Sequence, residues 1–194
     1  FSSLVPEERR IYSHLKRDGS IYRIFPYGAH EDMPLWLRPS MNAVYGIDSV
    51  AIYSPLTGRD YFLAMKGTGT VDDSIGIVPR DEQVLYEKLD LLKKMNVKYV
   101  ISTEELSSEE LFLAVEEKGL YLYELKGYLP RSFFARDLSA EGQGQAGIRV
   151  AEYRSGRAEI DIDTPVPGIL VLSEKYFPGW QAMVDGRKAS ISRY

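Results

Sequence analysis

The spacing of hydrophobic residues changes along the chain and divides it into two regions. From residue 81 to residue 95 apolar side chains recur mostly three and four positions apart, which predicts a helix. An unbroken apolar run at residues 97–102 follows directly and predicts a buried strand. From residue 157 to residue 163 small or apolar residues alternate strictly with acidic ones, as in a half-buried antiparallel strand. The sequence therefore predicts helices mixed with strands first, and antiparallel strands afterwards.

Further helix signals lie on either side of this first pattern. Residues 6–16 begin with a proline and two glutamates and carry their basic residues later, in agreement with the helix dipole. A capping-box pattern at residues 107–110 predicts a helix through Glu117. Strands are expected after each helix, at residues 22–25 and 120–125. Helices and strands that alternate at this spacing predict an α/β lobe with a mixed sheet that is at least partly parallel.

A change of composition separates the two regions. Residues 138–147 are rich in Gly, Gln, Ala and Ser, which is typical of a linker. The glycines at residues 142–147 match a dinucleotide-binding fingerprint as a string, but that fingerprint works only where a strand leads into a helix. A strand is predicted to follow here, which favours the linker. The predicted domains are thus residues 1–137 and 148–194.

The second lobe is predicted to be a partial antiparallel β-sandwich of the jelly-roll type. Strand-like runs at residues 148–153, 168–173 and 180–184 accompany the alternating strand, and Asp185-Gly186 predicts a two-residue type I′ hairpin turn. A hairpin with a large apolar face needs more strands or a packed helix to be stable in water. We therefore expect this lobe to be completed by further polypeptide, or its free edge to favour self-association.

Composition and charge exclude several classes of function. A formal net charge of −4 and an isoelectric point near 5.3 argue against nucleic acid as a partner. The chain has no cysteine, which excludes disulfides, thiolate nucleophiles and zinc bound by cysteine. No run of residues approaches the length and hydrophobicity that a membrane span needs.

Two groups of acidic residues were weighed as candidate sites. Glu159, Asp161 and Asp163 share one strand face and have the oxygen chemistry that calcium prefers, but neighbours on one strand face lie roughly 7 Å apart, which favours a solvated surface. Asp72 and Asp73 have the chemistry of an acid and base pair, but a solvated loop explains them equally simply.

No catalytic residue, metal site or cofactor is predicted. The two histidines, His14 and His30, stand in no spacing that suggests a metal pair or a catalytic triad. No serine lies in a nucleophile-elbow sequence, so acyl-enzyme chemistry has no support.

Aromatic residues are the remaining signal for ligand binding. Fourteen tyrosines and two tryptophans, with Asp, Asn and Arg nearby, suit stacking against sugar rings, although packing in the core explains most of them. An arginine after Leu129-Pro130 can clamp an anionic group or pair with a carboxylate across the lobes. The ligand-binding residues predicted on this basis are Tyr45, Asp48, Tyr53, Arg131, Tyr176 and Trp180.

Several motifs together resemble one known family. Residues 173–180, with the sequence Ser-Glu-Lys-Tyr-Phe-Pro-Gly-Trp, are followed by Val184-Asp-Gly186. Residues 42–49, 96–102 and 129–133 occur earlier in the matching order. In these segments the chain resembles the C-terminal extracytoplasmic region of YfhO-type bacterial membrane proteins, over roughly residues 22–194.

The resemblance implies a location, partners and a function. It implies a bacterial cell membrane protein, with this region extracytoplasmic and membrane spans upstream in the same polypeptide. That family is related to glycosyltransferases that use polyprenyl-phosphate sugars, with the catalytic acid expected in a loop between upstream spans. This region would then bind the acceptor or support the enzyme, with a cell-envelope glycan or a lipid-linked sugar as possible partner. The alternative is a non-catalytic carbohydrate- or protein-binding module at the cell surface, and a free-standing hydrolase is the weakest hypothesis.

Overall fold

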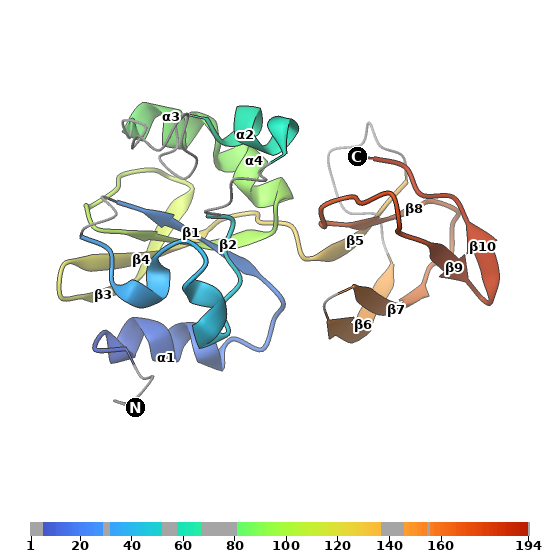
Figure 1. Ribbon diagram of the computed structural model, residues 1–194, viewed down its shortest axis with the longest axis horizontal. Helices are drawn as coiled ribbons and strands as arrows, with labels where there is room; N and C mark the ends of the chain where they lie inside the picture. Colours follow the sequence, from blue (N-terminus) through green and yellow to red (C-terminus); the bar gives the residue numbers. More distant parts are fainter. Residues whose placement is uncertain are drawn as a thin grey trace. The chain divides into compact units, whose positions relative to one another are not determined.

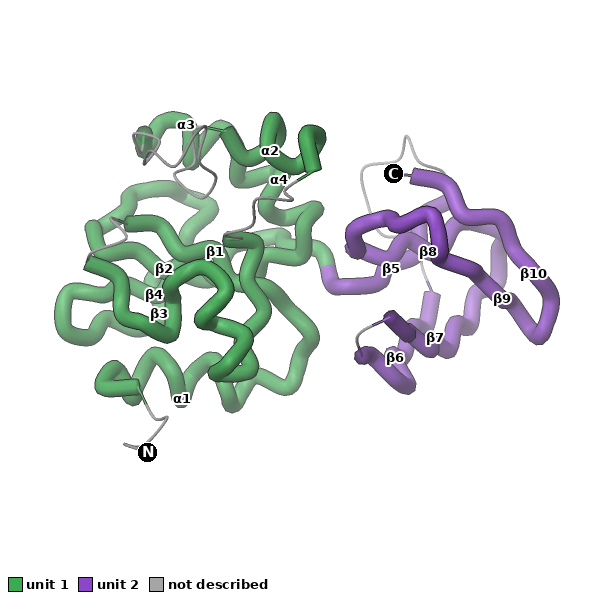
Figure 2. The backbone as a smooth tube through the Cα atoms, viewed as in Figure 1, with its two compact units in different colours: residues 1–129 green, residues 130–194 purple. Residues whose placement is uncertain are grey.

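The chain forms two compact units, residues 1–129 and residues 130–194 (Figure 2). We analysed a computed structural model, which describes residues 6–28, 32–51, 58–66, 81–136, 146–154 and 156–193. The fold class is a mixed α+β fold, as predicted: helices and a mixed sheet in unit 1, and antiparallel strand pairs in unit 2.

A four-stranded sheet in the order β1-β2-β4-β3 forms the centre of unit 1 (Figure 1). Its strands are β1 (Arg23–Tyr27), β2 (Val97–Ser102), β4 (Leu120–Leu125) and β3 (Leu111–Glu117). β1 and β2 are parallel, whereas β4 is antiparallel to both of its neighbours. The apolar run of β2 is buried on both faces, and this explains why its sequence does not alternate.

Helices cover both faces of this sheet and create two separate cores. On one face, α1 (Arg9–Arg17) and the 3₁₀ turn η1 (Leu35–Leu37) pack with Ile24 and Ile101. On the other, α2 (Arg59–Met65), α3 (Glu82–Glu87) and α4 (Leu89–Lys94) pack with Phe25 and Val100. A second 3₁₀ turn, η2 (Asn42–Tyr45), lies beside η1. Figure 1 shows α2–α4 on one side of the sheet and α1 on the opposite side.

The helix predicted at residues 81–95 is present but interrupted. Asp81 caps α3 by accepting a hydrogen bond from the backbone N–H of Gln83, and Lys88 separates α3 from α4. Asn96 follows α4 with a left-handed φ of 62°. The amide of this fully buried side chain donates to the carbonyl oxygens of Ile21 and Leu129, at 3.2 and 3.0 Å. Asn96 therefore ties the start of β2 to two distant loops of unit 1.

The helix predicted from residue 107 to residue 117 was wrong, because these residues form a turn and then β3. Lys118 and Gly119 both have positive φ, 52° and 76°, as a type I′ hairpin turn requires. They join β3 directly to β4, with Glu117 paired to Leu120. The capping-box pattern is local, and the pairing gained with β4 outweighs it. Glu117 still caps a helix, because its carboxylate accepts the backbone N–H groups of Arg10 and Ile11 in α1 at 2.8 and 3.3 Å.

Unit 2 is built from three antiparallel strand pairs. β5 (Ser132–Ala135) pairs with β8 (Ile169–Leu172), β6 (Gly147–Arg154) with β7 (Arg157–Asp163), and β9 (Ala182–Val184) with β10 (Arg187–Ala189). Because β5 pairs with β8, unit 2 begins at Pro130, earlier than the boundary expected from the glycine-rich segment. The predicted type I′ turn is confirmed, since Asp185 and Gly186 have φ of 49° and 76°.

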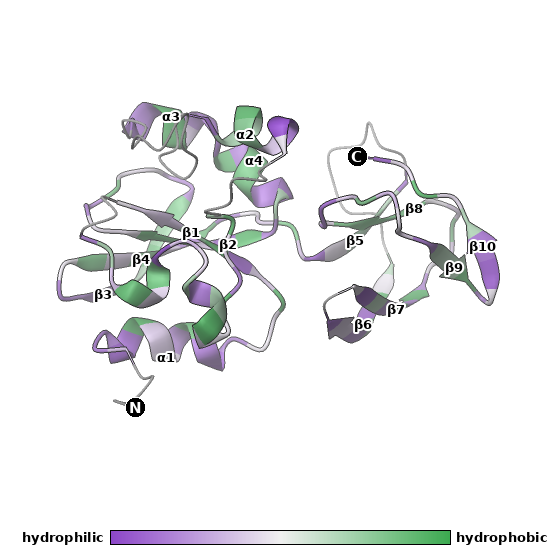
Figure 3. Cartoon of the chain, in the orientation of Figure 1, coloured by the Kyte–Doolittle hydropathy of each residue, from purple (hydrophilic) through white to green (hydrophobic). Residues whose placement is uncertain are grey.

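Unit 2 buries little apolar surface among the residues that the structure describes. Its buried hydrophobic side chains belong to Phe133, Phe134, Ala135 and Val171, all on the β5–β8 pair. Apolar residues on β7, β8, β9 and the segments around them remain exposed, and Figure 3 shows hydrophobic positions along these strands. Within the described ranges, no helix is long and apolar enough to cross a membrane.

Candidate functional site

The structure distributes the six predicted ligand-binding residues between the two units. Tyr45 and Asp48 lie in unit 1, and Arg131, Tyr176 and Trp180 lie in unit 2. Tyr53 lies outside the described residues.

Tyr45 and Asp48 have structural contacts in unit 1. The Tyr45 ring is half-buried against the core beneath α1, and its carbonyl oxygen accepts the hydroxyl of Tyr12 at 3.3 Å. The carbonyl oxygen of Asp48 accepts the backbone N–H of Ile24 at 2.8 Å, while its side chain is exposed. These contacts connect the turn after η2 to α1 and β1, so both residues contribute to the packing of unit 1.

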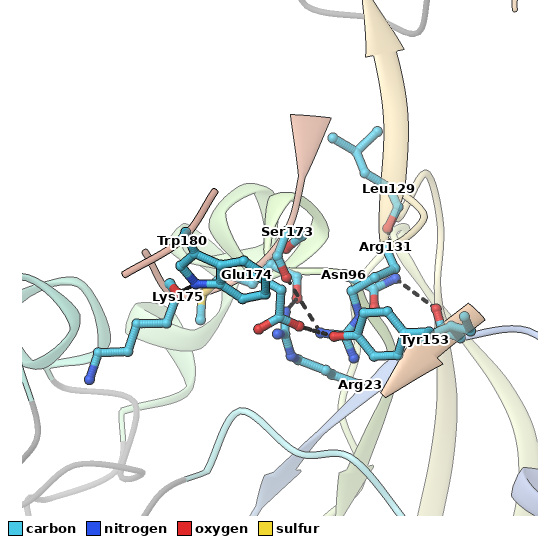
Figure 4. Close-up of polar contacts among 11 residues, drawn as sticks. Arg23, Asn96, Leu129, Arg131, Tyr153, Ser173, Glu174, Lys175 and Trp180 are labelled. Atoms are coloured by element: carbon cyan, nitrogen blue, oxygen red, sulfur yellow. Dashed lines mark hydrogen bonds and ion pairs between the residues drawn. The ribbon is translucent and has the colours of Figure 1, made fainter. Parts of the chain in front are cut away.

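Arg131 is the centre of a polar cluster in unit 2 (Figure 4). Its guanidinium lies 3.1 Å from the carboxylate of Glu174 and donates to the carbonyl oxygen of Ser173 at 3.4 Å. The Tyr153 ring lies under the same guanidinium, 5.1 Å from its centroid, and the Tyr153 hydroxyl donates to Glu174. The cluster therefore joins β5, β6 and the end of β8.

The geometry of this cluster favours the second of the two predicted roles of Arg131. The Arg131 side chain is only 2% exposed, and a carboxylate, a carbonyl oxygen and an aromatic face already surround its guanidinium. The partner carboxylate belongs to the same unit, not to the other lobe. In this arrangement the arginine holds strands together, which suits its planar, multidentate donor group.

The other two predicted residues of unit 2 lie in the segment between β8 and β9. The indole N–H of Trp180 donates to the carbonyl oxygen of Lys175 at 3.3 Å, which folds the segment back on itself. Tyr176 is 39% exposed, with the Arg193 guanidinium 5.0 Å from its ring centroid. Phe177, which the sequence analysis did not select, is 55% exposed beside Lys175. Two adjacent flat rings are thus accessible in this segment.

The candidate acidic sites carry ion pairs where the structure describes them. Asp161 pairs with Arg149, and Glu159 pairs with Arg157, across and along the β6–β7 hairpin. The described parts of the chain contain no group of three or more residues able to hold a metal ion. Asp72, Asp73, His30 and most of the glycine-rich segment lie outside the described residues. His14 lies on α1, with its ring edge-on to Tyr99.

A second polar cluster, which sequence analysis missed, ties α1 to the sheet of unit 1. Asp18 accepts hydrogen bonds from Lys98 at 2.7 Å, from the Tyr99 hydroxyl at 2.9 Å and from Ser20. Burial alone would raise the pKa of Asp18, but these hydrogen bonds outweigh it and lower the pKa from 3.8 to about 2. Burial, followed by the Asp18 carboxylate, raises the pKa of the Tyr99 hydroxyl. Asp18 is therefore ionised and fully used inside the fold.

Acid should weaken unit 1 through Asp18. Because the carboxyl has a lower pKa in the folded state, its stabilising contribution is present above pH 4 and is lost as the pH falls towards 2. We expect Asp18→Asn to destabilise the protein at pH 7 and to flatten the decline of unfolding free energy between pH 4 and pH 2. Urea denaturation at a series of pH values measures both effects. The exposed Asp161→Asn variant is the control, and an identical acid slope in the two variants would contradict the assignment.

The chain was also compared with known proteins. It matches no family model, no curated protein and no solved structure.

Proposed function

We propose that this chain is the extracytoplasmic region of a polytopic bacterial membrane protein that resembles polyprenyl-phosphate-sugar-dependent glycosyltransferases. In this proposal it binds the acceptor or provides structural support while upstream membrane segments modify a cell-envelope glycan. The motif resemblance over residues 173–186 supports the family, and the exposed apolar surface of unit 2 supports the role in a larger assembly.

The exposed surface of the β9–β10 hairpin is the observation that carries the proposal. Met183 and Val184 are neighbours on β9, so their side chains point to opposite faces, yet they are 57% and 58% exposed. Every residue of β10 is exposed as well. An isolated two-stranded hairpin is marginally stable in water, and apolar patches of this kind normally pack against other protein. We assign that covering role to further polypeptide of the same membrane protein.

The first test concerns the native protein in its membrane. An antibody raised against this chain should detect a species much larger than 22.0 kDa that sediments with membranes and resists carbonate extraction. Protease added outside intact protoplasts should degrade the epitope if the region is extracytoplasmic. A soluble species near the mass of this chain would contradict the proposal.

Substitutions in the hairpin test the assigned occupant. In the full-length protein, Met183→Lys should strongly reduce the steady-state amount in the membrane, because it places a charge in a covered apolar contact. Gln181→Lys adds the same charge at an exposed polar position and should leave the amount unchanged. Equal amounts of both variants would contradict the covering role. A concentration-dependent dimer of this chain that Met183→Lys abolishes would instead identify a second copy as the occupant.

A carbohydrate-binding module is the second candidate function, and Tyr176 and Phe177 favour it. Two adjacent exposed rings offer the flat apolar faces on which sugars stack. Binding of purified envelope glycan that is lost in Tyr176→Ala, but kept in the buried-core control Phe134→Leu, would support this function. It would place the acceptor at the segment between β8 and β9.

A further inference from the structure

The outer side of α1 is strongly basic although the whole chain is acidic. The net charge of the chain is −4, yet the nine residues of α1 contain three arginines, one lysine and no acid. Ile11 and Leu15 anchor the helix in the core by one face. The lysine, Lys16, reaches the carbonyl oxygen of Gly46 and so lies apart from the arginines.

The arginines line a groove between α1 and the sheet, with a volume of about 520 Å³. This volume falls within the range of small-molecule sites, roughly 300–1,000 Å³. Tyr99 of β2 and Val115 of β3 form the apolar wall opposite the helix, and α1 packs along β3 (Figure 1). The helix contributes polar residues spaced over two turns: Arg9, Arg10, Ser13, His14 and Arg17.

The negative charges near this groove are already used. Asp18 lines the groove, but Lys98 pairs with its carboxylate at 2.7 Å. Glu117 caps the first turn of α1 through two backbone N–H groups. Arg10 donates to the carbonyl oxygen of Glu116 at 3.5 Å. Arg9 and Arg17, in contrast, have no side-chain partner among the residues that the structure describes, so two guanidinium groups remain available.

We propose that this groove binds a phosphate-bearing ligand, held by Arg9 and Arg17 with help from Ser13 and His14. Guanidinium groups match phosphate oxygens bidentately, and such charge-assisted hydrogen bonds are about twice as strong as neutral ones. Arg9 and Arg17 are eight positions apart, which corresponds to about 12 Å along a helix. The two arginines therefore suit a ligand with two phosphates, or one phosphate and a second acceptor. The proposal does not depend on the membrane assignment.

Binding of pyrophosphate to the full chain at low ionic strength, measured by titration calorimetry, tests the site. The double variant Arg9→Gln/Arg17→Gln should bind at least tenfold more weakly than the parent chain. Arg59→Gln/Arg187→Gln removes the same charge from two exposed arginines elsewhere and should bind within about twofold of the parent. Near-ultraviolet circular dichroism checks that both variants keep their fold.

Vesicles distinguish a free phosphate from a lipid headgroup. Flotation with phosphatidylglycerol vesicles, compared with neutral phosphatidylcholine vesicles, uses the same two variants. Loss of either pyrophosphate or anionic-vesicle binding specifically in Arg9→Gln/Arg17→Gln supports the site and identifies its source of phosphate. If neither probe binds, or if both double variants lose binding equally, the proposal is wrong.

Discussion

We expect Glu174→Ala to destabilise unit 2 by about 2–3 kcal/mol, because it leaves the Arg131 guanidinium buried without its carboxylate. Arg131 is almost fully buried, whereas Glu174 is 26% exposed. Arg131→Met should therefore cost less than Glu174→Ala: it fills the space with an apolar chain and leaves a carboxylate that water reaches. The order of these two variants distinguishes a buried charge penalty from the simple loss of one contact.

The tryptophans allow the effect to be measured in unit 2 alone. The chain has two, Trp36 in unit 1 and Trp180 in unit 2. In a Trp36→Phe background, urea unfolding followed by fluorescence reports on Trp180. Glu152→Ala is a matched control, because Glu152 pairs with Arg154 and Arg157 at an exposed site, where such pairs contribute about 0–1 kcal/mol. Equal losses in Glu152→Ala and Glu174→Ala would show that the cluster does not hold the strands together.

Asn96→Ala should destabilise unit 1 by about 3 kcal/mol, since it removes two buried hydrogen bonds and places alanine at a positive φ. Asn96→Gly loses the same hydrogen bonds but tolerates the backbone conformation. It should therefore retain about 1 kcal/mol more stability than the alanine variant. In a Trp180→Phe background, the fluorescence of Trp36 follows this unfolding. Equal stability of the two variants would mean that backbone conformation contributes nothing at this position.

Much of unit 1 could be predicted because its signals are local. The continuous apolar run of β2 and the basic end of α1 each lie within one short segment, and the structure confirms both elements. The type I′ turn at Asp185-Gly186 is equally local. The error at β3 has the opposite cause, since the capping-box residues gave a helical signal and only pairing with β4 makes the segment a strand.

The sites depend on contacts between distant residues, which the sequence does not reveal. Arg131 could be singled out, but its partner Glu174 lies 43 positions later. The basic residues of α1 were visible, yet Tyr99 and Val115, which turn them into one side of a groove, come from strands far along the chain. The spacing of Arg9, Ser13 and Arg17 by four was the only available signal for that side of the helix.

The cap that Glu117 provides for α1 has a consequence for the order of folding during synthesis. Helix α1 is made first, but its first-turn N–H groups receive their carboxylate from a residue 107 positions later. A nine-residue helix is too short to be stable alone in water. On the ribosome, α1 must therefore wait until the β3–β4 hairpin has emerged, so the N-terminal end of unit 1 is completed last.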